Sequence, residues 1–470
     1  MKIKHLDLTT DIDQDKPFKN CKLDREKYAE VLTNIVSSYS DGFVLAINNK
    51  WGTGKTTFVK MWEKSLENKG FQTVYFNAWE NDFENNPLTA LMGELMVLSE
   101  ESKKDFDNLL KKGATITKHI APIIVKAVAD KYIDIDSLKN ALVGLSKGMA
   151  NVFEDDVKEY AKKKENIADF RASLEKFIAK SIVKKPLIFI VDELDRCRPN
   201  YAVSILEQIK HLFSIPNIVF VLSIDKEQLG NAVRGVYGSD KIDADEYLRR
   251  FIDLEYSLPI PSEGVFYKYL YDYFKFDEFF ESSARNRRKS HYEIKSQFLK
   301  YCDIIFLNNN ISLRVQEKIF GLIRTSLRSV DHHDYIIPQL LLLLVYIKIV
   351  DNEFYNKLKN KELSFIDAQK GFLKTLLHSK NEETENLLIY LEAYFVNSYN
   401  LYTRDRLGRS ELFKYDKETN REICTISSVV NENLNDEFHR HLEHHSRFNN
   451  YAYNLEFMLD RIDLLVNLKD

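Results

Sequence analysis

The chain has 470 residues, enough for about three domains of ordinary size, and 44% of them are apolar, which is enough to bury a substantial core. This composition excludes a disordered, collagen-like or disulfide-stapled chain. Basic and acidic residues nearly balance at 67 and 71, so the net charge of −4 gives no chain-wide electrostatic reason to bind nucleic acid or an anionic membrane. Glycine and proline are scarce, at 15 and 9 residues, which favours a helix-rich protein.

The cysteines and the apolar stretches predict a cytoplasmic protein without a transmembrane segment. The four cysteines lie far apart and form no Cys-x-x-Cys pair, which argues against zinc ribbons and disulfide frameworks. The first residues carry no apolar core like that of a signal peptide. The longest apolar stretch, residues 335–350, falls short of the roughly 20 residues that span a bilayer, so we expect it to form a buried helix.

Residues 1–261 alternate short apolar runs with helical patterns, which predicts a parallel sheet covered by helices. Five strands are predicted, at residues 43–48, 72–77, 186–192, 217–224 and 252–258. Residues 186–192 are almost continuously apolar, as in a strand that is buried on both faces. Residues 56–69 follow the first strand as an amphipathic helix that ends at Gly70.

Two further regions are predicted to be helical. Residues 84–184 separate the second and third strands and are too many for an ordinary crossover, so we interpret them as a helical insertion. From residue 262 onward, leucine, phenylalanine and tyrosine recur at helical spacing, which predicts an all-α region. Within it we expect a lid-like part at 262–350 and a C-terminal part at 351–470, for which the sequence suggests no role.

The most specific motif follows the first strand and opens the helix after it. Residues 49–56, Asn-Lys-Trp-Gly-Thr-Gly-Lys-Thr, occupy the position of a Walker A loop and match its second half. Glycines at 52 and 54 allow main-chain N–H groups to approach phosphate oxygens at a helix N-terminus. Lys55 would bind the β- and γ-phosphates of ATP, and Thr56 would be a ligand of Mg²⁺. The residues expected to contact the nucleotide are Asn49, Trp51, Gly52, Thr53, Gly54, Lys55, Thr56 and Thr57.

Asn49 departs from the pattern, which has glycine at this position. Asparagine tolerates the left-handed backbone conformation better than most residues, so we expect the loop to form with Asn49 in that conformation. A distorted loop that binds ATP without hydrolysing it is the alternative. We also expect Lys55 to be partly exposed to solvent.

A second motif lies at residues 187–195, an apolar strand that ends in acidic residues. Asp192 would hold Mg²⁺, usually through a water molecule, and Glu193 would orient and polarise the water that attacks the γ-phosphate. An acidic surface turn after a strand has the same composition, so the motif gains its meaning from its position behind the phosphate-binding loop.

These motifs resemble those of the KAP family of P-loop NTPases. The resemblance rests on residues 51–56 (Trp-Gly-Thr-Gly-Lys-Thr), 76–80 (Phe-Asn-Ala-Trp-Glu) and 192–197 (Asp-Glu-Leu-Asp-Arg-Cys). Many members have a second aspartate where this chain has Glu193, and either carboxylate could act as a base. The resemblance continues through 223–225 and 247–251 and covers about residues 20–350.

Membership would imply a sheet of the additional-strand type and ATP hydrolysis coupled to conformational change in a complex. It would also suggest a role in bacterial defence against phage, with a homo-oligomer or partner proteins in the defence complex. Many relatives carry transmembrane helices between the two Walker motifs, whereas the insertion in this chain lacks them.

Several polar residues near the motifs stay ambiguous in the sequence. Asp225, which follows the fourth strand, could sense the γ-phosphate or be an ordinary turn residue. Glu80 could be a second acid near the nucleotide or a charge at a helix N-terminus. An arginine finger could be any of five residues, namely Arg196, Arg198, Arg234, Arg249 and Arg250.

The sequence as a whole predicts a P-loop ATPase with an α/β core, a helical insertion and an all-α C-terminal region, which uses ATP and Mg²⁺. A nucleotide-stabilised scaffold with negligible turnover is the alternative. The basic run at 285–289 would suit a nucleic-acid motor, but it lacks interleaved aromatic residues, and the balanced charge does not favour that interpretation. ATP is favoured over GTP because the sequence has no Asn-Lys-x-Asp-like motif.

Overall fold

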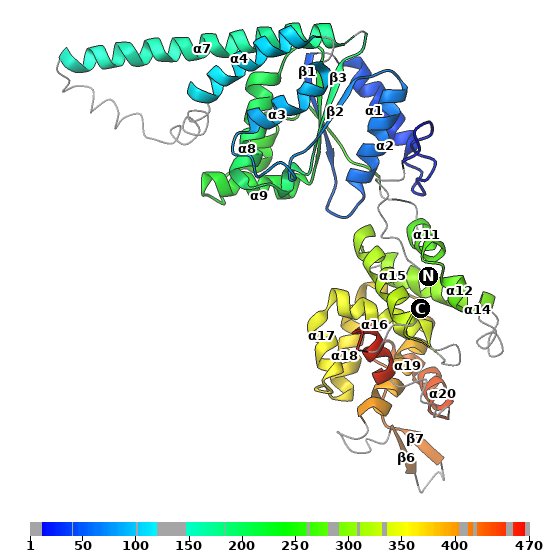
Figure 1. The fold of residues 1–470 in the computed structure, drawn as a ribbon. Coiled ribbons are helices and arrows are strands. Elements are labelled where there is room, and N and C mark those ends of the chain that lie inside the picture. The colour runs from blue at the N-terminus through cyan, green and yellow to red at the C-terminus, as the bar shows by residue number, and fades with distance from the viewer. Residues whose placement is uncertain are drawn as a thin grey trace. The chain divides into compact units, whose positions relative to one another are not determined.

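The computed structural model divides the chain into two compact units, residues 6–260 and residues 261–470, and each is described by itself (Figure 1). The residues that the structure describes are 12–39, 41–99, 102–119, 147–182, 184–259, 261, 264–280, 291–307, 311–330, 336–403, 412–416, 421–447 and 455–465. The basic run at 285–289 lies outside them.

The first unit is built on a five-stranded parallel sheet, as the sequence predicted. Its strands are β1 (Asp41–Asn48), β2 (Thr73–Asn77), β3 (Leu187–Asp192), β4 (Ile218–Ile224) and β5 (Leu254–Tyr256). They are ordered β2-β3-β4-β1-β5, and all four neighbouring pairs are parallel. The strand β4 lies between β1 and β3, which confirms the additional-strand arrangement.

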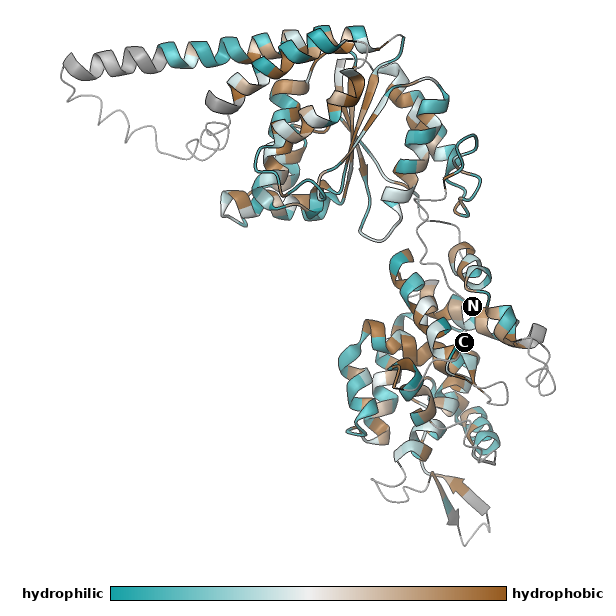
Figure 2. Ribbon diagram, in the orientation of Figure 1, coloured by the Kyte–Doolittle hydropathy of each residue, from teal (hydrophilic) through white to brown (hydrophobic). Residues whose placement is uncertain are grey.

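Helices cover both faces of this sheet because the strands are apolar on both sides. In β1, Leu45 and Ile47 pack against α1 (Glu26–Ser38) and α2 (Lys55–Asn68). On the opposite face, Val44 and Ala46 belong to a second core. This core also includes residues of three helices, α3 (Pro87–Leu95), α8 (Pro199–Gln208) and α9 (Lys226–Tyr237). Figure 2 shows the apolar strands between these two layers.

The predicted insertion between β2 and β3 is helical where the structure describes it. It contains α3, a short 3₁₀ turn at Met96–Ser99, α4 (Lys103–His119) and α7 (Lys147–Ser181). The helices α4 and α7 pack together through Phe106 and Phe177, whose ring centroids are 5.2 Å apart. Their apolar sides join the core on the α8 face of the sheet, so the insertion enlarges that core.

The second unit is mainly helical. It contains α11 (Val265–Tyr273), α12 (Phe276–Phe280), α14 (His291–Cys302), α15 (Leu313–Leu327), α16 (Pro338–Val350), α17 (Asn352–Lys359), α18 (Phe365–Leu376), α19 (Glu385–Thr403), α20 (Asn435–Arg447) and α21 (Leu455–Ile462). The helix α16 is buried on all sides between Gln339 and Ile347, which confirms the prediction for the longest apolar stretch. In the described part of the chain, no helix combines the length and apolar character needed to cross a bilayer.

A small hairpin interrupts the helices and corrects the expectation of an all-α region. The strands β6 (Phe413–Asp416) and β7 (Arg421–Cys424) pair antiparallel, with Phe413 opposite Cys424. Each strand has four residues, which is too short to produce a recognisable alternation of apolar and polar residues in the sequence.

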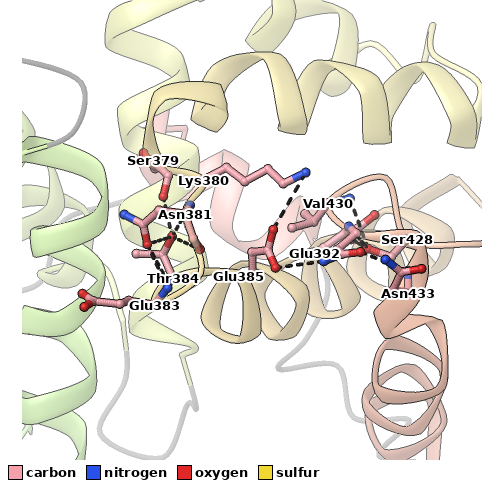
Figure 3. Close-up of polar contacts among 11 residues, drawn as sticks. Ser379, Lys380, Asn381, Glu383, Thr384, Glu385, Glu392, Ser428, Val430 and Asn433 are labelled. Atoms are coloured by element: carbon pink, nitrogen blue, oxygen red, sulfur yellow. Dashed lines mark hydrogen bonds and ion pairs between the residues drawn. The ribbon is translucent and has the colours of Figure 1, made fainter.

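A fully buried carboxylate joins this hairpin region to the helices. Glu392 of α19 is 0% exposed and accepts hydrogen bonds from Gln369 Nε2 (2.8 Å), Ser428 Oγ (2.6 Å) and the main-chain N–H of Val429 (2.9 Å). Burial raises the pKa of Glu392, while these hydrogen bonds oppose the shift. Figure 3 shows Glu392 beside Ser428 and, two turns earlier on α19, Glu385 facing Lys380.

We expect Glu392→Ala to destabilise this unit by about 2–4 kcal/mol, because three donors, two of them on the buried side chains of Gln369 and Ser428, would lose their acceptor. Hydrogen exchange of α19 amides, followed by mass spectrometry, would show faster exchange than in the wild type. Glu385→Ala is the control and should have a smaller effect, because it removes a 4.0 Å ion pair with Lys380 and one hydrogen bond from Asn431 Nδ2 (2.8 Å) instead of three hydrogen bonds to a fully buried carboxylate. Equal exchange rates in both variants would show that the Glu392 network does not stabilise α19.

Candidate nucleotide site

The candidate site lies at the carboxyl edge of the parallel sheet. Asn77 of β2 pairs in register with Asp192 of β3, and Asp192 pairs with Ser223 of β4. Asn48 of β1 pairs with Ile224 of β4. Four strands therefore end at nearly the same level, and the segments that follow them meet there, which is where open parallel sheets bind ligands.

The loop between β1 and α2 has the geometry of an anion-binding loop. Gly52 and Gly54 have φ of +78° and +80°, which only glycine adopts without strain. Gly54 is the N-cap of α2, no side chain caps the helix, and its first turn has no acidic residue. The main-chain N–H groups and the positive end of the helix dipole are thus available to a phosphate group.

Lys55 is more buried than expected. It is only 9% exposed, and its ammonium donates hydrogen bonds to the main-chain oxygens of Asn49 and, at 3.3 Å, Lys50. The expectation of a partly exposed Lys55 was wrong because the side chain folds back over the loop. Burial lowers the pKa of Lys55, and the nearby carboxylates of Asp195, Asp225 and Asp192 oppose that shift.

Asn49 does not use the left-handed conformation that the sequence suggested. It is not among the described residues with positive φ, and its N–H donates to the carbonyl of Ile224 (3.1 Å), which extends the pairing of β1 with β4. Its side-chain amide makes two hydrogen bonds with the main chain of Leu258, one as donor (2.9 Å) and one as acceptor (2.8 Å). Asparagine here joins the start of the loop to the chain that follows β5.

We expect Asn49→Ala to destabilise the loop by about 1–3 kcal/mol, because the N–H and C=O of Leu258 would lose their partners. Asn49→Gly should have the same effect, although it restores the usual residue of the motif. Asn49→Asp keeps the acceptor but not the donor and should fall between alanine and the wild type. Thermal unfolding measures the loss of stability. If Asn49→Gly is as stable as the wild type, the hydrogen bonds between Asn49 and Leu258 do not stabilise the loop.

Two aspartates hold Trp51 in the loop. The main-chain N–H of Trp51 donates to Asp225 Oδ2 at 3.3 Å, and its indole N–H donates to the Asp195 carboxylate. The other Asp225 oxygen accepts the N–H of Gln228 (3.4 Å) and caps α9. Asp225 therefore connects the loop to the start of α9. Its contact with the γ-phosphate stays a prediction.

Arg25, which precedes α1, supports the loop from outside the predicted motifs. Its guanidinium donates to the main-chain oxygens of Thr53 (2.8 Å) and Gly54 (3.1 Å), and the residue is only 3% exposed. These bonds satisfy carbonyl groups of the loop and leave its N–H groups available to a ligand. Sequence analysis missed Arg25 because no spacing rule connects it to residues 49–56.

Asp192 ends β3 as a buried oxygen donor. It is 1% exposed, its Oδ1 accepts the N–H of Glu193 (2.9 Å), and its Oδ2 accepts the hydroxyl of Tyr75 on β2 (2.9 Å). Burial and the nearby Asp192 carboxylate raise the pKa of Tyr75, so Tyr75 remains a hydrogen-bond donor. Carboxylate and hydroxyl oxygens are the ligands that Mg²⁺ prefers, so the residues present, Asp192 and Thr56 in the first turn of α2, fit this ion.

Glu193 has an unusual backbone and a paired side chain. Its φ and ψ are +59° and +25°, a left-handed conformation that costs about 1–3 kcal/mol in a non-glycine residue and clusters at functional sites. Arg196 Nη1 lies 2.9 Å from Glu193 Oε1. Burial raises the pKa of Glu193, while Arg196 acts in the opposite direction.

Of the remaining sequence candidates, Arg196 lies at this centre, whereas Arg234 bonds Asn231 and Arg249 pairs with Glu246. Arg196 lies over the ring of Trp79 at 5.5 Å, and Trp79 is 53% exposed. Glu80 is exposed, and its N–H donates to Asn77 Oδ1 (3.2 Å). Arg198 pairs with Asp82 at 2.9 Å, and of the five arginines only Arg196 pairs with Glu193.

Strand order and loop geometry together define a P-loop nucleoside-triphosphate-binding domain. The comparison with family models agrees, because residues 25–342 match the model described as the KAP family P-loop domain. The match covers well over half of the chain, and the protein belongs to the KAP family of P-loop NTPases. No curated protein matches the sequence.

Three solved structures resemble the chain weakly. The Aeropyrum pernix ORC2 protein, in ADPNP-ADP complexes, is 13% identical, with a TM-score of 0.33 and coverage of 90% of this chain and 95% of that one. The Drosophila ORC bound to DNA is 12% identical, with a TM-score of 0.27 and coverage of 98% and 88%. A DNA replication initiation factor is 11% identical, with a TM-score of 0.27 and coverage of 82% and 99%.

Proposed function

We propose that the protein hydrolyses ATP in a Mg²⁺-dependent reaction. The observation that carries this proposal is the meeting of the loop at 49–56 with the acidic end of β3. Trp51 in the loop bonds Asp195, and Lys55 lies close enough to Asp192 for the two charges to interact. Phosphate-binding groups and carboxylates suited to a metal ion and an attacking water therefore share one small region.

Each residue has a proposed role in this reaction. The main-chain N–H groups of residues 52–57 and the Lys55 ammonium bind the β- and γ-phosphates, and Asn49 and Trp51 set the shape of the loop. Thr56 and Asp192 hold Mg²⁺, which when bound neutralises charge on the phosphate oxygens. Glu193 orients a water in line with the γ-phosphate and accepts its proton as the new P–O bond forms and the bond to the β-phosphate oxygen breaks.

One observation favours a second function, a nucleotide-stabilised scaffold with little turnover. The carboxylate of Glu193 is paired with Arg196, so in this arrangement its capacity to bind a water is reduced. A protein fixed in this arrangement would bind ATP and hydrolyse it slowly.

The family resemblance is the basis on which we infer that the protein acts in a homo-oligomer or with partner proteins in bacterial defence against phage. The scattered cysteines are the basis on which we infer a cytoplasmic location. Light scattering with and without ATP would show whether the molar mass changes, and identification of co-purified proteins would reveal partners. Both measurements test assembly separately from ATP hydrolysis.

The chemical proposal is tested by measuring nucleotide-induced thermal stabilisation and phosphate release from the same preparation. We expect ATP with Mg²⁺ to stabilise the protein and to release phosphate at a steady rate that chelation of Mg²⁺ abolishes. GTP should act more weakly. Stabilisation without phosphate release would support the scaffold. The absence of both stabilisation and phosphate release would overturn the proposed function.

A further inference from the structure

Arg196 occupies a place where three features of the site meet. It pairs with Glu193 at 2.9 Å, lies over the ring of Trp79 at 5.5 Å, and follows Asp195, which holds Trp51 of the phosphate loop. Its charge also lowers the pKa of Lys55, which places the two cations near each other. Arg196 is therefore close to both the candidate base and the candidate phosphate site.

Negative charge exceeds positive charge at this edge of the sheet, which would repel a bound triphosphate. Four carboxylates gather here, on Asp192, Glu193, Asp195 and Asp225, and the cations that interact with them are Lys55 and Arg196. Lys55 is already bonded to carbonyl groups of the loop. Arg196 is the cation whose partner is another side chain, so it can change partner without disturbing the loop.

A terminal phosphate would compete strongly with Glu193 for this arginine. The attraction between charges scales with their product, and a terminal phosphate carries up to twice the charge of a carboxylate. Arginine also binds phosphate oxygens in a bidentate manner as well as it binds carboxylates. The pair is partly exposed, with side-chain exposures of 21% for Arg196 and 13% for Glu193, so exchange does not require the core to open.

We propose that Arg196 is an exchangeable cation that pairs with Glu193 until a nucleoside triphosphate binds and then transfers to its terminal phosphate. This inference rests on the proposed function and deepens it. The transfer leaves the Glu193 carboxylate free to hold the attacking water, so the base is released only when the group to be cleaved is present. ADP lacks that phosphate and leaves Arg196 on Glu193.

Trp79 reports the exchange because the arginine that moves lies on its ring. The chain has three tryptophans, and the buried Trp62 of α2 serves as an internal reference. The experiment is ¹⁹F NMR of the full-length protein labelled with 5-fluorotryptophan, with the Trp79 resonance assigned by Trp79→Phe. The probes are a non-hydrolysable ATP analogue and ADP, each with Mg²⁺.

We expect the Trp79 resonance to shift with the triphosphate and to stay near its original position with ADP. In Arg196→Gln it should not respond to the triphosphate, and Arg196→Lys should restore part of the response. Arg198→Gln is the matched control, because Arg198 pairs with Asp82 and should leave the response intact. We also expect Arg196→Gln to weaken triphosphate binding by about 10- to 100-fold and ADP binding by less than about 2-fold.

Two results would overturn the exchange while the proposed function stands. One is a Trp79 shift of equal size with ADP and triphosphate, and the other is an unchanged triphosphate response in Arg196→Gln. Thermal stabilisation by nucleotide, measured on the same samples, separates these cases from failure of the proposed function. If neither nucleotide stabilises the protein, both proposals are overturned.

Discussion

The Lys55→Ala variant is expected to lose most of its affinity for ATP, by about 10- to 100-fold, because charged hydrogen bonds to the phosphates would be missing. Direct titration with a fluorescent ATP analogue measures the loss. Since Lys55 is buried and bonded to carbonyl groups of its own loop, the substitution should also lower thermal stability modestly. Binding must therefore be compared at a temperature where both proteins are folded.

Two further variants isolate the charge from the packing. Lys55→Met fills most of the same volume without a charge and should bind ATP as weakly as Lys55→Ala. Lys64→Ala, on the same helix but paired with Glu67 at the surface, should bind like the wild type. ATP affinity in Lys55→Met equal to that of the wild type would contradict a direct role for the ammonium.

The second large effect is expected in Glu193→Gln. Glutamine keeps the shape and one acceptor oxygen but removes the charge and basicity, so turnover should fall roughly 100-fold or more while ATP still binds. Steady-state phosphate release measures the loss, and thermal stabilisation by ATP checks that binding persists. Glutamine should also release Arg196 from its ion pair.

Glu80→Gln is the control for this prediction, because Glu80 is an exposed acid in the turn after β2. It should leave turnover close to that of the wild type. If Glu193→Gln hydrolyses ATP normally and Glu80→Gln does not, the base is Glu80 and the proposed role of Glu193 is wrong.

The strands and the main motif could be predicted because they depend on local patterns. The predicted strand at 186–192 is found as β3 at Leu187–Asp192, since a continuous apolar run bounded by charged residues specifies a buried strand. The loop at 49–56 was recognisable from its two glycines and its place between strand and helix. The strand order came from the family resemblance, because one sequence does not show which strands are neighbours.

The contacts that support the site could not be predicted, because they join residues far apart in the chain. Tyr75 and Asp192 are 117 residues apart, and Arg25 lies 28 residues before Thr53. The prediction for Asn49 considered only the left-handed backbone conformation that asparagine tolerates. The residue that its side chain bonds, Leu258, is 209 residues away. Parallel pairing of β2 with β3 and of β1 with β5 brings the first and the last of these pairs together, whereas Arg25 reaches the loop from the start of α1.

The amide pair between Asn49 and Leu258 has a topological consequence. Along the covalent chain, the start of the phosphate loop and the exit from β5 are separated by 209 residues, yet two hydrogen bonds connect them directly. Leu258 comes three residues before residue 261, where the second unit begins. The pair therefore fixes the start of the loop to a point three residues before that boundary, by a direct contact that bypasses the 209 residues of chain between Asn49 and Leu258.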